Sequence, residues 1–320
     1  MRLYFGNDIR PEEAHSIVTI GTFDGVHCGH QSVLKALCGW AGAENSRAGV
    51  VTFREHPRKT LAPGGRSPDM VTTLEHRLVL FEREGVEFCW VLDFTPELSR
   101  FTAREFARRY FVDALKTRGL VMGFDSRFGS DRIGKDSPEL EPLAKELGFG
   151  VRAVEPVLSP EGEIISSTRI REAIIDGRLR DAEAMLGRHV SVYGTVIKGD
   201  ARGRRLGYNT ANIDLGNEVR PPFGVYATIA IVDGARHGSV TNVGYRPTIT
   251  QNLPPGEKPD LLIETHLFDF KGDLYGRKME VLFIEKLRDE RRFHDVTELV
   301  EQIKKDEARA RAILAARMKP

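Results

Sequence analysis

Residues 21–30 read GTFDGVHCGH, and this stretch decides the fold of the first half of the chain. It follows an apolar run, Ser16–Ile20, and leads into an amphipathic pattern over Gln31–Trp40. A strand, a glycine-rich turn and a helix in that order are typical of an open α/β sheet, where ligands bind beyond the carboxyl ends of the strands. The glycines let backbone approach a phosphate, and the helix N-terminus offers unpaired N–H groups. We therefore predict a phosphate site at residues 21–30.

Two histidines, His27 and His30, stand three residues apart in this stretch, with Gly29 between them. Both side chains can face the same spot, where as donors they would stabilise charge that grows on a phosphorus centre. The alternative is a glycine-rich loop that carries two exposed histidines, because short motifs also match by chance. The position of the motif between a strand and a helix favours the phosphate site.

The rest of the first half alternates apolar runs with helical patterns. Thr72 and Thr102 each stand three residues before a glutamate, which is the spacing of a capping box, and Ser137-Pro138 is typical of a helix start. Alternating strands and helices predict a Rossmann-like α/β/α domain with a parallel sheet. Its further strands are expected at Ala48–Phe53, Phe88–Phe94, Leu120–Phe124 and Val151–Val157.

The pattern changes near Gly187, after which strands follow one another without helices between them. Consecutive strands joined by Gly-, Pro- and Asn-rich segments predict an antiparallel sheet or β-barrel, with a terminal helix at Val296–Arg317 capped by Asp295. We expect one domain over residues 1–186 and a second over 187–320. The strands of the second are expected at Val190–Lys198, Val225–Val232, His237–Val243, Leu261–Phe268 and Met279–Lys286.

Composition excludes several classes of protein. The 320 residues hold 47 basic and 46 acidic side chains, a net charge of +1, which argues against nucleic acid as a partner. The 3 cysteines suggest neither a disulfide framework nor a zinc site, so a reducing cytoplasm fits best. We expect no membrane contact, because no apolar run approaches the roughly 18 residues of a membrane span and the N-terminus does not read as a signal peptide.

The stretch 21–30 resembles the signature of the nucleotidyltransferase superfamily that contains bacterial FAD synthetases. A second signature is expected later in the chain and is present as ISSTRIR at residues 165–171. Alone it reads as a helix cap, but paired with HxGH it indicates an ATP site. The resemblance implies that His27 and His30 catalyse attack at the α-phosphorus of ATP. The implied ATP contacts are Gly21, Thr22, Phe23, Asp24, Gly25, Gly29, Ser166, Ser167, Thr168 and Arg171.

Two shorter matches lie between these signatures. TFREHP at residues 52–57 resembles the family's strand-end motif, and GFDSRFG at 123–129 resembles its flavin-side loop. Glu55 and Ser126 depart from the usual proline and aromatic residue. The resemblance implies flavin contacts from His56, Asp125 and Phe128, with an ordinary packed aromatic as the alternative for Phe128.

Residues 199–212, GDARGRRLGYNTAN, resemble the ATP/Mg²⁺ loop of riboflavin kinases. Thr210 and Asn212 share a face of an extended segment, so their oxygens suit Mg²⁺ together with a phosphate. Without the resemblance, a surface turn rich in Gly, Arg and Asn is favoured. Asn209 replaces the proline of the family's usual Pro-Thr-Ala-Asn core, which removes a φ restraint. The implied ATP contacts are Gly199, Gly203, Arg205, Gly207, Thr210 and Asn212, the last two also as ligands of Mg²⁺.

The catalytic glutamate of the riboflavin kinases falls on Glu264. From the strand pattern alone, Glu264 reads as a glutamate on a wet strand face, so its role as general base rests on the resemblance. A further match at Leu287–Glu290, followed by Phe293, implies that Arg288 and Phe293 contact the flavin.

The resemblance spans about Ser16 to Phe293 and implies a bifunctional enzyme. One half would phosphorylate riboflavin to FMN with ATP and Mg²⁺, and the other would join FMN to a second ATP, giving FAD and pyrophosphate. Three alternatives stay open. They are a FAD synthetase whose second domain only binds flavin, a flavin-binding regulator without catalysis, and a nucleotidyltransferase with another acceptor such as a sugar phosphate.

Overall fold

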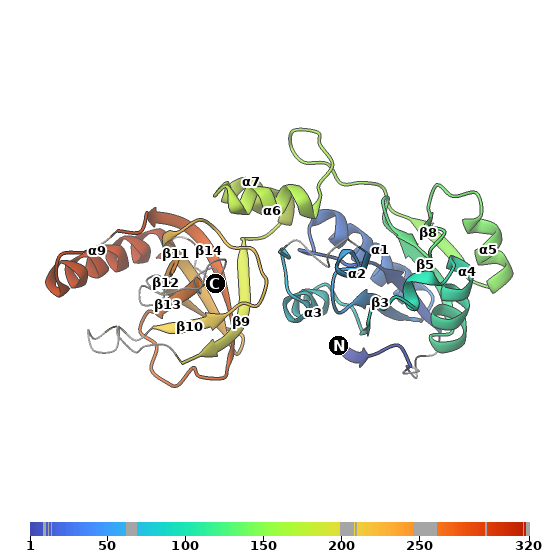
Figure 1. The fold of residues 1–320 in the computed structure, drawn as a ribbon, viewed down its shortest axis with the longest axis horizontal. Helices are drawn as coiled ribbons and strands as arrows, with labels where there is room; N and C mark the ends of the chain where they lie inside the picture. Colours follow the sequence, from blue (N-terminus) through green and yellow to red (C-terminus); the bar gives the residue numbers. More distant parts are fainter. Residues whose placement is uncertain are drawn as a thin grey trace. The chain divides into compact units, whose positions relative to one another are not determined.

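The computed structural model describes residues 1–8, 11, 13, 15–61, 69–198, 208, 210–245, 261–291, 293–315 and 317. The chain forms two compact units, Met1–Thr168 and Arg169–Pro320 (Figure 1). The predicted domain boundary falls after residue 186, whereas the two compact units divide after Thr168. The helices α6 (Ser167–Ile175) and α7 (Leu179–Leu186) occupy the stretch between these two positions. That boundary stays a prediction, because compactness assigns nearly all of both helices to the second unit.

The first unit is built on a sheet of six parallel strands, which confirms the predicted α/β class. The sheet grows from β2 to β3 and β4, and the chain then returns to add β5 on the other side of β2. The predicted strands are all present, with ends shifted by a few residues. The strand β1 was not predicted. In sheet order the strands are β1 (Arg2–Phe5), β4 (Phe88–Leu92), β3 (Arg47–Phe53), β2 (Ser16–Ile20), β5 (Thr117–Met122) and β8 (Gly150–Ala153).

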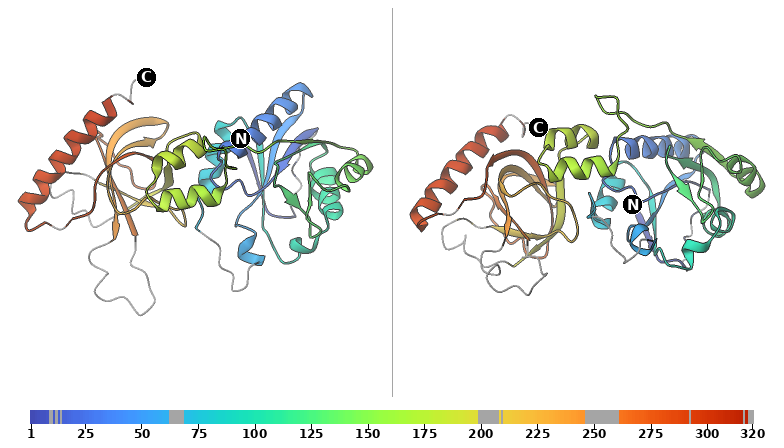
Figure 2. Two further views of the ribbon diagram at one scale, coloured as in Figure 1. Left: turned by 90° about the horizontal axis from the view of Figure 1, so that it is seen from above. Right: turned by 45° about the horizontal axis from the view of Figure 1, so that its top comes forward.

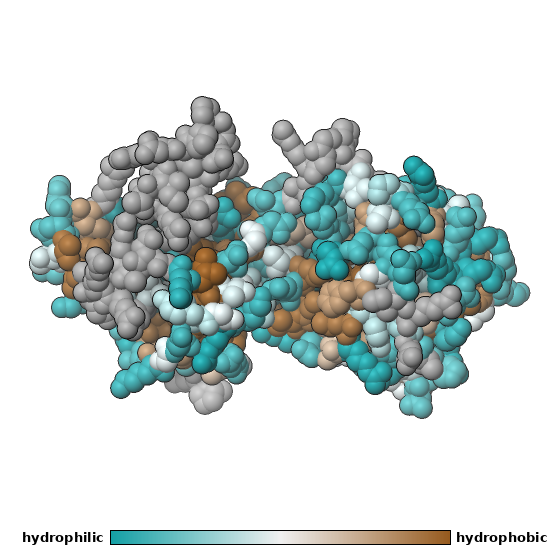
Figure 3. All heavy atoms as spheres, turned by 60° about the horizontal axis from the view of Figure 1, so that its bottom comes forward, coloured by the Kyte–Doolittle hydropathy of each residue, from teal (hydrophilic) through white to brown (hydrophobic). Residues whose placement is uncertain are grey.

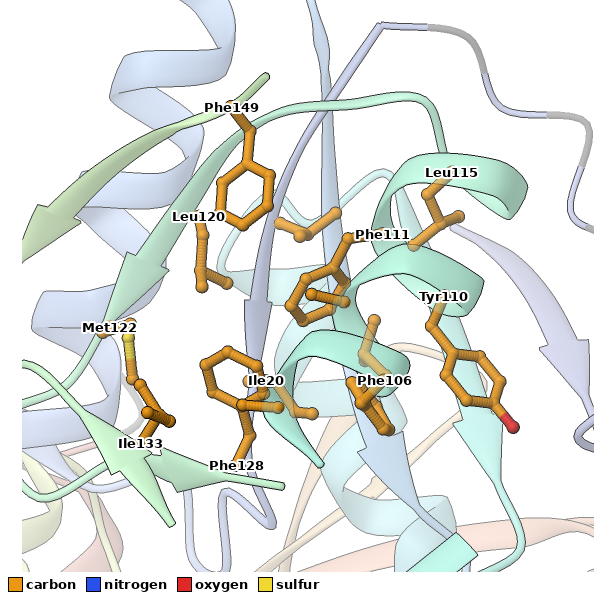
Figure 4. Close-up of a cluster of buried hydrophobic side chains, with 14 of the residues drawn as sticks. Ile20, Phe106, Tyr110, Phe111, Leu115, Leu120, Met122, Phe128, Ile133 and Phe149 are labelled. Carbon is orange, nitrogen blue, oxygen red and sulfur yellow. The ribbon is translucent and has the colours of Figure 1, made fainter. Parts of the chain in front are cut away.

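Helices cover both faces of this sheet, because its strands are apolar on both sides. On one face, α1 (Cys28–Ala43) and α3 (Leu74–Arg83) pack against side chains such as Ile17 and Val50. On the other face, Ile20, Leu120 and Met122 belong to one buried cluster with Phe106 and Phe111 (Figure 4). This second cluster involves α4 (Ala103–Phe106), the π-helix η2 (Ala107–Ala114) and α5 (Leu140–Leu147).

The helix starts follow the predictions in part. Thr102 forms the predicted capping box with Glu105 at the start of α4. The capping box predicted for Thr72 is wrong, because the neighbouring Thr73 caps α3 by accepting a hydrogen bond from the His76 N–H at 3.4 Å. The helix predicted to start at Ser137-Pro138 is present, but it starts two residues later. There the Ser137 hydroxyl accepts a hydrogen bond from the Gly134 N–H, and α5 begins only at Leu140.

The second unit is a closed barrel of six antiparallel strands, as the change of pattern predicted. The barrel closes because β10 pairs with both β13 and β9. The strand β10 was not predicted, because its four residues are too few to show an alternating pattern. In order around the barrel the strands are β10 (Ala211–Asp214), β13 (Leu261–Leu267), β12 (Ala235–Tyr245), β11 (Gly224–Val232), β14 (Lys278–Arg288) and β9 (Ser191–Ile197).

The terminal helix α9 (Val296–Ala315) lies across the outside of the barrel against β11, β12 and β14 (Figure 2). Its buried residues Ala310 and Leu314 belong to one apolar cluster with Val225 and Ile229 of β11. As predicted, Asp295 caps the helix, with its carboxylate accepting a hydrogen bond from the Glu298 N–H at 2.8 Å.

A chain of hydroxyl groups runs through the buried interior of the barrel. Thr228 hydrogen-bonds to Ser239 and to Thr241, each at 2.8 Å, and Thr241 hydrogen-bonds to Thr265 at 2.9 Å. All four side chains are fully buried. Each hydroxyl can donate once and accept twice, so the three hydrogen bonds use three of the four O–H donors within the chain itself.

The surface carries both hydrophilic and hydrophobic residues on the face drawn in Figure 3, where the hydrophobic ones gather in limited areas. Within the described part of the chain, no helix has the combination of length and apolar character that crossing a membrane requires.

Two glycines in the first unit provide a matched test of its packing. A Cβ on Gly49 of β3 would lie 2.0 Å from Cζ of the buried Phe88, whereas a Cβ on Gly39 of α1 would meet nothing within 4 Å. We expect Gly49→Ala to lower the free energy of unfolding by about 1–3 kcal/mol through overpacking. Gly39→Ala is expected to raise it by about 0.5–1 kcal/mol. Urea denaturation measures both, and an unchanged Gly49→Ala protein would contradict the described packing.

Candidate active sites

A cavity of about 410 Å³ opens in the first unit where the loops after β2 and β5 meet. β2 and β5 are the neighbouring strands at which the direction of sheet growth reverses, and such switch points hold ligands in open α/β sheets. The loop after β2 contributes six of the predicted residues to the cavity wall, namely Gly21, Thr22, Phe23, His27, Gly29 and His30. From the other predicted segments the wall includes Asp125, Phe128, Ser166 and Ser167.

The two histidines form one rigid unit at the start of α1. His27 is the N-cap residue, and its Nδ1 accepts a hydrogen bond from the His30 N–H at 3.4 Å. The rings stack with their centroids 3.6 Å apart and an angle of 18° between their planes. A Cβ on Gly29 would lie only 3.1 Å from Cε1 of His27, so glycine between the histidines leaves room for the ring. The pair therefore lines the cavity at a helix N-terminus, where anions are favoured.

The loop before the histidines has a strained backbone, which buried hydrogen bonds to Thr72 stabilise. Phe23 and Val26 have φ values of 51° and 40°, in the left-handed region that costs non-glycine residues energy. The Asp24 carboxylate, which is 2% exposed, accepts a hydrogen bond from the Thr72 N–H at 3.0 Å. The Thr72 hydroxyl in turn accepts one from the Gly25 N–H at 2.8 Å. Asp24 and Gly25 thus support the loop and do not line the cavity.

The second signature contacts this loop directly. Ser167 is the first residue of α6, and its hydroxyl donates a hydrogen bond to the Asp24 carbonyl at 2.8 Å. Thr168 and Arg171 follow on α6, and their ATP contacts stay predictions.

Phe128 lies in the predicted flavin-side loop, where it is a packed aromatic residue that also borders the cavity, and its flavin contact stays a prediction. Its ring is 5% exposed and packs 5.8 Å from the Phe111 ring, while the residue also lines the cavity (Figure 4). It belongs to a short hairpin of β6 (Arg127–Phe128) and β7 (Ile133–Gly134). Arg127 and Arg132 of this hairpin also line the cavity, and neither was predicted as a site residue, although Arg127 lies within the motif at residues 123–129.

The predicted strand-end motif reaches the cavity through Phe53 and Pro57. His56 is not among the lining residues. Its Nδ1 accepts a hydrogen bond from the Arg58 N–H at 3.1 Å, at the start of α2 (Arg58–Leu61).

A row of polar residues crosses three adjacent strands of the barrel. Glu264 of β13 lies opposite Asn212 of β10 on one side and opposite Asn242 of β12 on the other. Directly opposed residues of antiparallel strands point to the same face, with Cβ atoms about 4.5–5.5 Å apart. We call Asn212, Glu264 and Asn242 the polar row. Two of its members were predicted site residues, and pairing shows that they are neighbours, which the sequence could not.

Asn212 of the polar row has a buried side-chain acceptor for which the described residues provide no hydrogen-bond donor. It is 4% exposed, and its Oδ1 is buried without a hydrogen-bond partner among the described residues. A buried acceptor without a partner costs about 1–3 kcal/mol unless a ligand satisfies it. Amide and hydroxyl oxygens suit Mg²⁺, so Asn212, with Thr210 two residues before it, fits the expected metal.

The same register continues around the barrel from Asn242 to Val225 of β11 and on to Arg288 of β14. The Arg288 guanidinium forms an ion pair with Asp306 of α9 at 2.9 Å and lies 5.6 Å from the centre of the Phe293 ring. The two predicted flavin residues are therefore close to each other. Gly199, Gly203, Arg205, Gly207 and Asn209 lie outside the described residues.

A cavity at the switch point of a parallel sheet and a polar row on a closed barrel give the protein two candidate ligand sites, one in each compact unit. The FAD synthetase family model matches residues 9–169, and the riboflavin kinase model matches residues 186–314.

The relatives agree with both family models. The chain is 35% identical to a bifunctional riboflavin kinase/FMN adenylyltransferase of Bacillus subtilis, over 94% of this chain and 93% of the relative. It is 36% identical to one of Pseudomonas fluorescens, over 97% and 96%. A solved structure described as a macrolide-efflux protein from Streptococcus pneumoniae superposes with a TM-score of 0.78 at 32% identity, covering 97% of this chain and 99% of that one. The chain belongs to the family of bifunctional riboflavin kinase/FMN adenylyltransferases.

The two adjacent threonines before α3 allow a test of how the phosphate loop is held. Thr72→Val keeps the shape of the side chain but leaves the Gly25 N–H buried without its acceptor, so we expect a loss of about 1–3 kcal/mol in the free energy of unfolding. Hydrogen–deuterium exchange in a peptide covering residues 21–30 is expected to accelerate. Thr73→Val is the control, since it removes the helix cap, worth about 1 kcal/mol, and leaves the Thr72 hydrogen bond to Gly25 in place. Equal exchange in the two variants would contradict the assigned role of Thr72.

Proposed function

We propose that the protein makes FAD from riboflavin in two steps at the two sites described above. The barrel transfers the γ-phosphoryl group of one ATP to the 5′-hydroxyl of riboflavin, giving FMN and ADP. The α/β unit then lets the FMN phosphate attack the α-phosphorus of a second ATP, and pyrophosphate leaves. The observation that carries this proposal is the presence of both a switch-point cavity and a polar row, each in its own compact unit.

In the cavity, the chemistry needs positioning and charge stabilisation but no nucleophilic side chain. The phosphates of ATP would lie against the loop at residues 21–30 and the N-terminus of α1, with Ser166 and Ser167 on the same wall. The stacked His27 and His30 would donate hydrogen bonds to oxygens on the reacting phosphorus. Asp125 and Phe128 line the same cavity and would contact the flavin. Thr168, Arg171 and His56 are proposed to complete the site.

On the barrel, Glu264 would orient or deprotonate the riboflavin hydroxyl. Thr210 and Asn212 would hold Mg²⁺, and the ion would supply positive charge that offsets the charge of the ATP phosphates. The buried Oδ1 of Asn212 and its place opposite Glu264 support this arrangement. ATP contacts from Gly199, Gly203, Arg205 and Gly207, and flavin contacts from Arg288 and Phe293, belong to the same proposal.

We also propose the cytoplasm as the place of action, since all three cysteines are free thiols. The direct test of function supplies riboflavin and Mg-ATP and separates FMN from FAD by chromatography. Formation of both products is expected. FAD from supplied FMN without any FMN from riboflavin would instead identify a FAD synthetase with a flavin-binding second domain.

Removing one histidine is expected to separate the two activities. His30→Asn should abolish most FAD formation from FMN, because a donor to the reacting phosphorus is lost and such donors contribute about 10²–10³-fold to the rate. FMN formation from riboflavin should persist, since it occurs in the other unit. The matched control is His15→Asn, an exposed histidine of the same unit outside the cavity. Loss of both activities in a folded His30→Asn protein would rule out two independent sites.

The complementary prediction concerns Glu264. Glu264→Gln should slow riboflavin phosphorylation by roughly 10²–10⁴-fold, the usual contribution of a general base. FAD formation from supplied FMN should change little. Glu285→Gln on β14 serves as the control, because Glu285 is partly exposed and forms a surface ion pair with Arg309. Near-normal FMN production by Glu264→Gln would return Glu264 to the role of a strand-face residue.

A further inference from the structure

A fully buried guanidinium lies behind the phosphate loop of the first unit. Arg77 of α3 is 2% exposed, although arginine is almost never this buried without partners. It donates hydrogen bonds to the Thr22 carbonyl, to the Thr52 hydroxyl at 3.2 Å and to the Phe53 carbonyl at 3.3 Å. None of these contacts followed from the sequence, in which Arg77 reads as one more charged residue of a helix.

The acceptors of Arg77 belong to the two segments that a two-substrate reaction has to align. Thr22 lies in the loop after β2, which leads to the histidine pair. Thr52 and Phe53 end β3, which continues to Pro57. Thr22, Phe53 and Pro57 all line the cavity. One side chain from outside the cavity thus fixes the spacing between two parts of its wall.

The charge of Arg77 is balanced inside the protein. Burial lowers the pKa of Arg77 from its usual value, and the negative charge of Asp24 opposes this effect. Cys89 is also near, but burial raises its pKa to about 12, so its thiol is neutral at pH 7 and Asp24 supplies the negative charge. Lysine could keep the charge but has no planar fork, so it cannot reproduce the three directed hydrogen bonds.

We infer that Arg77 is a positioning residue for adenylyl transfer, holding the loop at residues 21–30 in register with the strand-end segment at residues 53–57. This inference rests on the proposed function of the cavity. Both segments line the same cavity and keep their own side chains, so loss of Arg77 disturbs the alignment of bound substrates more than the contacts that hold them. A misplacement of about 1 Å can cost a reaction roughly 10²-fold.

The test measures FAD formation from FMN and ATP by Arg77→Lys, with Arg83→Lys as the matched control, an exposed arginine on the same helix. We expect the Arg77→Lys kcat to fall about ten- to hundred-fold. The KM values for ATP and for FMN should stay within about threefold of wild type, in keeping with the alignment argument. FMN formation from riboflavin is the internal control, and a thermal melt shows whether the first unit is folded at the assay temperature.

A wild-type kcat in Arg77→Lys overturns the inference, and so does a loss of activity that only follows the unfolded fraction. If Arg77→Lys does not fold, Thr52→Val decides, because it removes one acceptor while the arginine stays. A severalfold lower kcat with unchanged KM values supports the positioning role, and a wild-type kcat overturns it. If the wild-type chain makes no FAD from FMN and ATP, that result contradicts the proposed function, and the positioning role of Arg77 is then contradicted as well.

Discussion

Parallel strands that are neighbours in a sheet end at the same edge, and the first half of the protein depends on this constraint. β2 and β5 are far apart in the sequence, yet their carboxyl ends meet, so that the histidine loop and the hairpin with Phe128 line one cavity. The loop of seven residues between β2 and α1 has positive φ values at Phe23 and Val26. Buried hydrogen bonds from neighbouring segments hold this costly turn in place.

The second half builds its site by a different geometrical rule. Antiparallel pairing places residues from successive strands side by side on one face, so a site can run across the middle of a sheet instead of along its edge. Asn212, Glu264 and Asn242 are brought together in this way by β10, β13 and β12. Closure of the barrel fixes their register, because a slip of one residue would turn each side chain to the other face.

The sequence predicted the two kinds of sheet and the position of the histidine pair, because these leave local signals in periodicity and glycine spacing. It missed β1 and β10, which are too short to show alternation, and it assigned the cap of α3 to Thr72 instead of Thr73. Arg77 and the pairing of Asn212 with Glu264 could not be predicted, since both depend on contacts between segments far apart in the chain. The described residues do not test the glycines of the predicted kinase loop.

The hydroxyl chain inside the barrel limits how this half of the protein can evolve. Replacement of Thr241 alone by valine would remove two hydrogen bonds and leave the buried Thr265 hydroxyl without the partner described for it, at a cost of about 1–3 kcal/mol, while Thr228 keeps Ser239. Replacement of the whole set by apolar residues of similar shape would cost far less. The effect of a substitution at any one of these four positions therefore depends on the residues at the other three. A substitution at one of them is expected to be followed by reversion or by substitutions at the others. The polar row lies on the outer face of the barrel and can change independently of them.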